Sequence, residues 1–486
     1  MRFLPSLPFS DKNDVQEKFF WAGVSLCLLL FLVSYYTEKM WMMALPFGVV
    51  LAWLCVTDFK QVFYLLLFCI PFSMEQELPG GLATDLPDEP LMWLLTGIFG
   101  VFALRNWPNM RGSYLRHPLT IILLIHISWM MTTIITSGNV MISVKFWLAK
   151  MWYVITFFFL AGHILRTETD GRKFFRAVFS TLFIMILVTL ARHAAEGFSF
   201  DSSNHVLYPF FRNHVNYAAI ISLFIPFVWW ATTWYRRFSP MWWLVALAVL
   251  IFMVGIQFSY TRAAYVSVVA AFGTIYIVRY CLMKYVLMAG FAALIWLVAG
   301  LVRQDNYLEH APEFKKTITH HNFDNLLEAT AKGEDISTME RVYRWVAGYH
   351  MARTSPAVGF GPGNFYNFYT TYAVSSFKTY VSDNPEHSGI HSYFLMTLVE
   401  QGFPGLLIFL ILTAAILMHG ERIYHQSTDL KRRRWVLALI LSTVAIDCIL
   451  LINDMIETDK VGPFFFMNIA MLINADLENK KENTAC

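Results

Sequence analysis

His391 is the residue whose type and position best suit proton transfer. It lies in the stretch from Ser388 to Leu395, where a long polar loop ends and an apolar helix is expected to begin. A histidine at the water-side mouth of a membrane helix titrates near neutral pH and can take a proton from a substrate. It could also be an interfacial histidine that only hydrogen-bonds a loop carbonyl. Which of these two interpretations applies depends on the elements around His391.

Three arginines could form an anion-binding site with His391 if the fold brings them to the same side of a membrane: Arg212, Arg262 and Arg341. The guanidinium group carries a fixed charge and a planar set of donors that matches phosphate oxygens. Arg262 lies in a tight turn between two apolar runs. An arginine there is costly if it faces lipid, so we expect it to face a protein or water cavity. Each arginine could instead reach toward lipid headgroups.

The composition is that of a polytopic membrane protein. The 486 residues are 57% hydrophobic and 15% charged, whereas soluble domains contain roughly 25% charged residues. The apolar residues form repeated runs of about 18–20, the length that spans a hydrocarbon core. The first run, 19–36, has no small-residue cleavage site and is followed by further runs, so we expect it to be retained as a helix. The predicted fold class is therefore all-α, a polytopic transmembrane helical bundle.

We predict about 12–14 membrane-spanning helices from these runs. They lie at 19–36, 40–57, 61–73, 90–104, 118–136, 147–165, 177–190, 216–234, 241–258, 263–278, 285–302, 398–418, 435–453 and 462–474. The predicted divisions of the chain are N-terminal helices (1–190), helices that carry outer-face arginines (191–302), a large outer loop (303–397), and C-terminal helices with a tail (398–486).

The distribution of Lys and Arg predicts the orientation. Alternate connections carry most of these residues, and the positive-inside rule assigns such connections to the cytoplasm. They include Lys60, Arg105, Arg111, Arg116, Arg166, Arg172, Lys173, Arg176, Arg236, Arg237, Arg279, Lys284 and the run 431–434. Both termini are then cytoplasmic, and Arg212, Arg262, Arg341 and His391 all lie at the outer face. The outer segment 74–89 is acidic and has no basic residue, in agreement.

The outer loop is too aromatic and apolar to be a flexible linker. Ser337 to Glu340 resembles an N-cap, which predicts a helix from Arg341 to about Arg353. A glycine-rich run at 359–363 then ends it.

Three motifs resemble the O-antigen ligase and O-antigen polymerase family. They are Thr261-Arg262-Ala263, which is similar to an S-R-G/A turn; Arg341 to Trp345 followed by 355–365, which is similar to R-x-x-x-W … P-x-x-G-x-G-x-G-x-F; and His391 to Leu395 followed by 400–406, which is similar to H-N/S-x-x-L … E-x-G-x-x-G-L. Their order and their predicted outer placement match the family over about 205–420. Thr261 replaces the usual serine.

The resemblance implies a glycosyltransferase-C-like helical enzyme of the bacterial inner membrane. Its donor would be a glycan on undecaprenyl diphosphate, and its acceptor would be lipid A core, another glycan or a protein. The family implies no metal, nucleotide sugar or other cofactor, and nothing suggests a nucleic acid partner. Carried over, Arg262 and Arg341 would bind the diphosphate, with Arg212 in a looser match, and His391 would be the general base at the periplasmic face.

The chemistry is consistent with these assignments. Displacing a lipid diphosphate from an anomeric carbon requires charge stabilisation on the leaving group, which arginines can supply. It also requires a base for the incoming hydroxyl, which a neutral imidazole can supply. Neighbouring arginines should lower the pKa of the histidine and keep it neutral.

Three other interpretations remain open. A zinc site could be drawn from His320, His321, His387 and His391, although the six cysteines form no CxxC pair and none lies in the large loop. A hydrolase could use Asp383, His387 and Ser388, but no nucleophile-elbow sequence surrounds the serine. A transporter or flippase of lipid-linked sugars would place charges near the bilayer midplane, where Asp447 is the one such residue expected.

Overall fold

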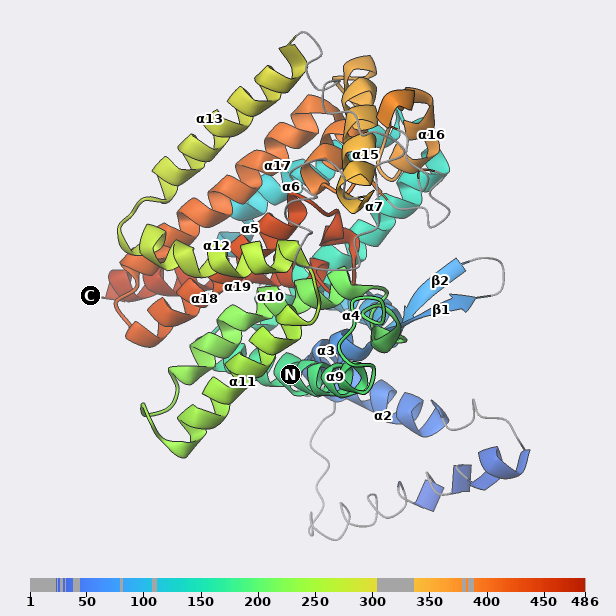
Figure 1. Cartoon of the computed structure of the whole chain (residues 1–486). Helices are drawn as coiled ribbons and strands as arrows, with labels where there is room; N and C mark the ends of the chain where they lie inside the picture. The colour runs from blue at the N-terminus through green and yellow to red at the C-terminus, as the bar shows by residue number, and fades with distance from the viewer. Residues whose placement is uncertain are drawn as a thin grey trace.

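The structure is a computed structural model, and it describes residues 44–78, 82–106, 112–303, 336–377 and 389–485, together with Ser382 and parts of 23–37. Almost all of these residues are helical (Figure 1). The first half of the chain forms α2 (Ala44–Thr57), α3 (Phe59–Cys69), α4 (Asp88–Asn106), α5 (Gly112–Leu115), α6 (Pro118–Ile134), α7 (Val140–Val154), α8 (Ala161–Ile164) and α9 (Glu168–Ala195). A π-helical turn, η4 (Ile155–Leu160), joins α7 to α8 without a break.

The second half continues with α10 (His214–Thr232), α11 (Pro240–Gln257), α12 (Arg262–Arg279), α13 (Met283–Val302), α15 (Ile336–Thr354), α16 (Phe365–Tyr372), α17 (Tyr393–Gln426), α18 (Leu430–Leu450) and α19 (Gly462–Ala485). Several of the helices begin at residue types that cap helices. Asn139, Thr167, Asn213 and Ser239 each accept a hydrogen bond from a backbone N–H three residues later.

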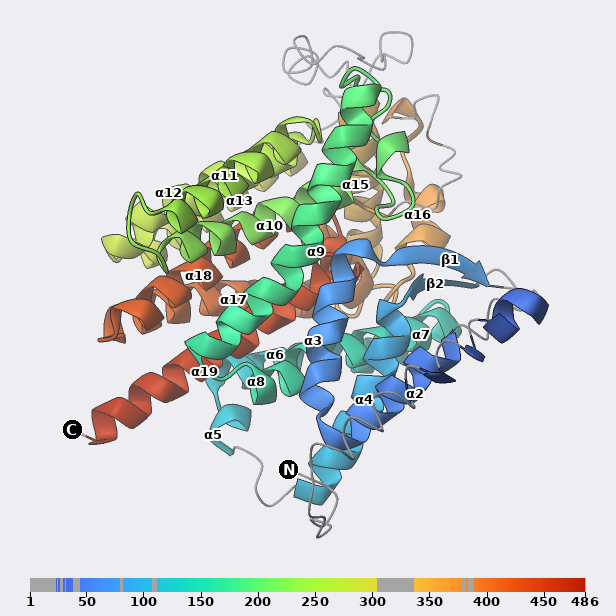
Figure 2. The ribbon, with the colours of Figure 1, turned by 90° about the horizontal axis from the view of Figure 1, so that it is seen from below.

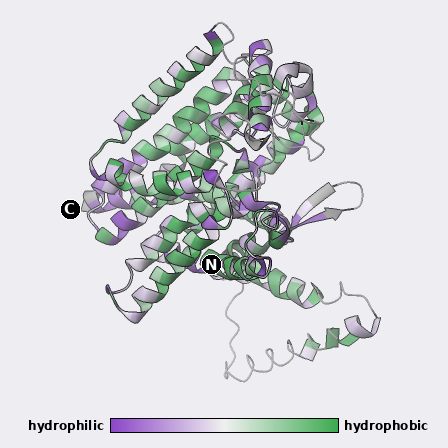
Figure 3. Cartoon of the chain, viewed as in Figure 1, coloured by the Kyte–Doolittle hydropathy of each residue, from purple (hydrophilic) through white to green (hydrophobic). Residues whose placement is uncertain are grey.

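Each predicted membrane span from 61–73 onward coincides with a helical segment, although several predicted spans extend past the end of the helix. Within the described residues, seven helices are long and apolar enough to cross a membrane, and three more are apolar but shorter. Hydrophobic residues predominate along most of the helices (Figure 3). The exposed faces of α13, which packs little against the rest, are typical of a helix in contact with lipid. The predicted all-α transmembrane fold is confirmed.

The centre of the bundle is formed by α10 and α18. α18 packs against α10, α12 and α17, and most of α10 is buried on all sides. The Trp230 and Trp435 rings join the two helices with centroids 4.5 Å apart. Burying a helix around its whole circumference requires an apolar sequence throughout, which α10 has.

The acidic segment that was predicted at the outer face contains a β-hairpin. β1 (Met74–Leu78) pairs antiparallel with β2 (Leu82–Leu86), with Met74 opposite Leu86. The hairpin projects from the bundle beside α4 (Figures 1 and 2). The outer helix α15 also differs from the prediction, because it has already begun at Ile336 and the expected cap residues lie inside it.

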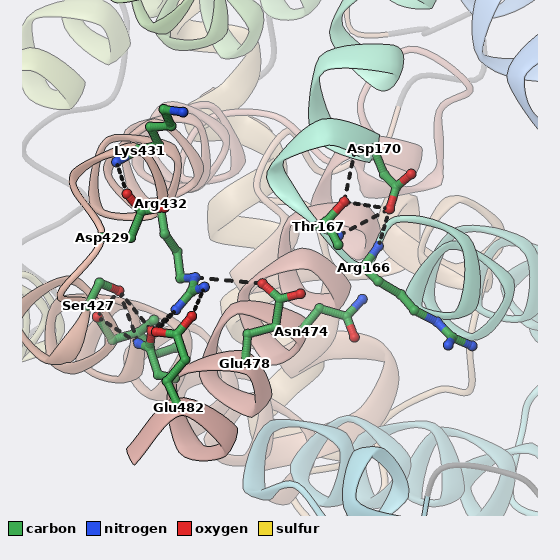
Figure 4. Close-up of polar contacts among 12 residues, drawn as sticks. Arg166, Thr167, Asp170, Ser427, Asp429, Lys431, Arg432, Asn474, Glu478 and Glu482 are labelled. Atoms are coloured by element: carbon green, nitrogen blue, oxygen red, sulfur yellow. Dashed lines mark hydrogen bonds and ion pairs between the residues drawn. The ribbon is translucent and has the colours of Figure 1, made fainter. Parts of the chain in front are cut away.

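One end of the bundle gathers the connections that the basic residues assign to the cytoplasm. Arg432 binds Glu482 in two hydrogen bonds and lies 3.6 Å from Glu478, both on α19 (Figure 4). Asn474, also on α19, donates to the carbonyls of Gly162 and Leu165, which precede the capping box of α9. The connections 165–167 and 427–429 and the end of α19 therefore lie together.

The opposite end gathers the connections assigned to the outer face. The Gly138 N–H donates to the Phe360 carbonyl at 3.0 Å, which joins the α6–α7 turn to the outer domain. The Lys460 ammonium, in the α18–α19 linker, donates to the Ser73 hydroxyl at 2.7 Å beside the hairpin. The candidate residues lie at this end.

Candidate active site

His391 is held between the outer helix α15 and the start of α17. The Arg344 Nη1 donates to the Gly389 carbonyl at 3.3 Å, and the Trp345 Nε1 donates to the Ile390 carbonyl at 3.0 Å. Ser392 then caps α17 by accepting from the Leu395 N–H at 3.5 Å. The residues on both sides of His391 are therefore anchored, and α15 supplies the upstream anchors.

The His391 backbone is in a conformation that non-glycine residues rarely adopt. Its φ is +56°, in the left-handed region, where such residues persist only when their surroundings fix them. Within the described residues the His391 ring makes no hydrogen bond, so its nitrogens can face a substrate.

The electrostatic surroundings keep the His391 ring neutral. Burial, together with the nearby Arg341 and Arg344 guanidinium groups, lowers the pKa of His391 to about 3. Because this pKa lies well below physiological pH, His391 is neutral there. The neutral imidazole is the form that can accept a proton. The sequence predicted the direction of this shift from neighbouring arginines, and the structure adds burial as the larger cause.

Arg341, on α15, is near both His391 and His214. Its charge acts on both His391 and His214. The imidazole of His214 is bound at Nδ1 by the Asn204 side chain at 2.8 Å. Arg341 is thus close to two histidines from different elements.

Arg262 is held near His214 by a contact of the preceding residue, Thr261. The Thr261 hydroxyl donates to the His214 carbonyl at 3.3 Å, which holds the α11–α12 turn against the start of α10. Arg262 is the first residue of α12, and its side chain is half-buried. The structure therefore brings Arg262, Arg341 and His391 to one corner of the bundle.

Arg212 lies two residues before His214 but is on the surface. Its side chain is exposed, and no hydrogen bond or ion pair joins it to any other described residue. It is close to the corner along the chain, with a side chain that is less constrained than those of Arg262 and Arg341.

Two charged residues of the corner were not predicted. Arg344 is buried and pairs with Glu340 at 3.5 Å, one helical turn earlier on α15. Asp454, in the α18–α19 linker, lies against Gly389: a Cβ on that glycine would be 1.9 Å from the Asp454 Oδ2. Burial raises the pKa of the Asp454 carboxyl, while Arg344 and Arg341 oppose this rise. Arg344 could have been found, because it lies within the R-x-x-x-W motif, but no local pattern marks Asp454.

The glycine run has a structural role that the motif did not reveal. α17 is broken at Gly402, whose φ is +71°, and Pro404 has no N–H to bond the Glu400 carbonyl. The run supplies the missing donors: Phe360 N–H to Val399 O at 3.0 Å, and Gly361 N–H to Glu400 O at 2.9 Å. We call these contacts, between 356–363 and 399–403, the glycine clamp.

The clamp depends on close approach between two backbones. A Cβ on Gly359 would lie 2.4 Å from the Glu400 carbonyl carbon, and one on Gly402 would lie 2.5 Å from that of Ala357. The Glu400 carboxylate also accepts from the Gly363 and Phe365 N–H groups at 2.8 and 3.2 Å, so it caps α16. Glu400 and the glycines therefore act as structural residues.

The zinc and hydrolase interpretations involve residues that the structure does not describe. His320, His321, His387, Asp383 and Ser388 all lie outside the described residues. Among those described, no group of three or more His, Cys, Asp or Glu side chains could hold a metal ion.

Comparison with known proteins agrees with the motifs. No curated protein matches the chain. The family model described as O-antigen ligase matches residues 247–410, a stretch that contains Arg262, Arg341, His391 and the glycine clamp but not Arg212. In this stretch the chain is similar to the O-antigen ligase family, which confirms the resemblance that its motifs predicted.

Proposed function

We propose that this protein transfers a glycan from undecaprenyl diphosphate to an acceptor hydroxyl at the periplasmic face of the inner membrane. The family match supports a glycan-transferring membrane enzyme of O-antigen or polysaccharide biosynthesis. The observation that carries the finer proposal is that His391 is neutral and lies beside the Arg341 and Arg344 guanidinium groups, at one end of a transmembrane bundle. The acceptor is lipid A core, a second glycan or a protein.

In the proposed reaction His391 accepts the proton of the acceptor hydroxyl. The acceptor oxygen forms a bond to the anomeric carbon, and the bond from that carbon to the diphosphate oxygen breaks. The diphosphate leaves with the electron pair. Arg341 and Arg262 stabilise its charge, so that neither metal nor nucleotide cofactor is required. Arg212, being exposed, assists as the diphosphate enters.

Donor binding would also activate the base. With the site empty, a pKa of about 3 makes His391 a weak proton acceptor. A bound diphosphate brings negative charge next to Arg341 and Arg344 and offsets their effect on the ring. The pKa of His391 then rises toward its ordinary range, so the base becomes effective when the donor is present.

Chemical rescue tests the role of His391. Glycine tolerates a φ of +56°, so His391→Gly should fold while losing about 10²–10⁴-fold in transfer rate. Added imidazole should restore part of that rate in proteoliposomes that contain a lipid-linked glycan donor. His205→Ala, at an exposed histidine of the same end, is the matched control. Full activity of His391→Gly without imidazole would exclude His391 as the base.

Cysteine labelling tests the sidedness. Thr370 on α16 and Lys431 at the start of α18 are both exposed and lie at opposite ends of the bundle. In a cysteine-free background, a membrane-impermeant thiol reagent added to spheroplasts should label Thr370→Cys and not Lys431→Cys. Labelling of both, or of Lys431→Cys alone, would contradict a periplasmic site and cytoplasmic termini.

A further inference from the structure

A network of three polar residues, two of them buried and the third 21% exposed, lies at the start of α17. Lys150 comes from α7, Tyr393 is the first residue of α17, and Glu457 belongs to the short helix η9 (Met455–Glu457) in the α18–α19 linker. Lys150 and Tyr393 are 3% and 1% exposed. Lys150 and Glu457 lie outside the stretch matched by the family model.

The network fixes Tyr393 by its hydroxyl and by its ring. The Lys150 ammonium donates to the Glu457 carboxylate and, at 3.1 Å, to the Tyr393 hydroxyl. That hydroxyl in turn donates to the same Glu457 oxygen at 3.2 Å. The ammonium also lies 5.3 Å from the centroid of the Tyr393 ring, which packs edge-on against Phe409 at 4.8 Å.

Stability alone does not explain such a network. Taking an ammonium and a carboxylate out of water costs several kcal/mol, and apolar replacements of a buried pair are often neutral or stabilising. Ionisable groups at membrane depth are rare and usually serve function. What the network provides is a defined position for Tyr393, two residues after His391.

The strained backbone of His391 explains why Tyr393 has to be held in a defined position. A non-glycine residue at φ +56° must be fixed from both sides. Arg344 and Trp345 bind the two carbonyls that precede His391. Beyond Ser392, Tyr393 is the next residue that is anchored to other elements, and Lys150 and Glu457 anchor it.

We propose that Lys150 and Glu457 are positioning residues that act through Tyr393 to hold His391 in its strained, reactive orientation. This inference rests on the proposed role of His391 as base. It assigns α7 and the α18–α19 linker to the active site, although neither belongs to a motif.

The test separates positioning from stability. Lys150→Met leaves Glu457 without its cation and should lower both stability and transfer. The double variant Lys150→Met/Glu457→Leu replaces the pair by apolar groups, so its thermal stability should return to near wild type. Its kcat should stay lower by about 10²-fold, the effect expected of a misplaced catalytic group, with the KM for donor within about two-fold. Tyr393→Phe should resemble the double variant.

Lys145→Met, at an exposed lysine of the same helix, is the matched control and should behave as wild type. A double variant that recovers both stability and kcat would overturn the inference, because the network would then be structural only. So would a Tyr393→Phe variant with wild-type kcat.

Combination with His391→Gly distinguishes this inference from the proposed function. If Lys150 acts through His391, Lys150→Met/Glu457→Leu should cause no further loss in the His391→Gly background. An additional loss there would overturn the positioning role while leaving His391 as base. Full activity of His391→Gly by itself would instead overturn the proposed function.

Discussion

The glycine clamp, at the break in α17, and the His391 corner, just before that helix, are close in sequence but are built on opposite principles. In the clamp, backbone groups satisfy one another, and positive φ values fall on glycines such as Gly359 and Gly402. At the corner, the positive φ falls on a histidine, and the neighbours are charged. His391 and the clamp both lie in the stretch that the O-antigen ligase family model matches. The glycine motif thus serves the fold, whereas the strained, charged corner has the features that the proposed chemistry requires.

Gly359→Ala should have the largest effect on stability. The new Cβ would lie 2.4 Å from backbone of α17 at a φ of +68°. Overpacking costs about 1–3 kcal/mol, in addition to the strain of a left-handed alanine. Gly197→Ala is the control, because Gly197 has the same φ and open space around it. Thermal unfolding in detergent measures both, and equal losses would show that the close approach does not matter.

Arg262→Lys should lower activity without lowering stability. Lysine keeps the charge but loses the planar pair of donors that matches a diphosphate. Charge-assisted hydrogen bonds are worth about 1.5–3 kcal/mol, so kcat/KM for the donor should fall by roughly 10- to 100-fold. Arg237→Lys, exposed at the other end of the bundle, should be near normal. An unaffected Arg262→Lys enzyme would indicate an arginine that only contacts headgroups.

Arg341→Gln should move the pH dependence. A base must be neutral, and the pKa of His391 in the empty enzyme is about 3. The kcat/KM of the wild type, which reports the free enzyme, should therefore not fall through protonation of His391 between about pH 8 and 5. Removing the Arg341 charge raises the pKa of His391, so the acidic limb of kcat/KM should move to higher pH. An acidic limb that stays in place would show that Arg341 does not act on His391.

Asp447→Asn should have the smallest effect. Asp447 lies in α18, and neither of its carboxylate oxygens has a hydrogen-bond partner among the described residues. A transporter that used this carboxylate would depend on its charge. A transferase working at the outer corner should keep its transfer rate within about two-fold, measured in the same proteoliposomes. A large loss would favour the transporter interpretation.

The helical fold and the order of the motifs could be predicted from the amino-acid pattern alone. Each span predicted by hydropathy from 61–73 onward coincides with a helical segment, because each backbone segment in lipid must satisfy its own hydrogen bonds. The distribution of Lys and Arg predicted that Arg262, Arg341 and His391 lie at the same end of the bundle, and in the structure they do. The acidic segment 74–89 showed the limit of this approach: its polarity indicated exposure, but its pairing into a hairpin depends on two strands meeting.

The assembly of the corner, by contrast, depends on contacts between residues that are far apart in the chain. Lys150 and Glu457 are 307 residues apart in sequence and meet because α7 and the α18–α19 linker pack beside α17. The same packing places Asp454 against Gly389 and joins the glycine run to a broken helix. Periodicity and charge describe which face of a helix is apolar, but they carry no information about which distant helix packs there. The partners of His391 therefore depend on long-range packing, which the sequence pattern does not encode locally.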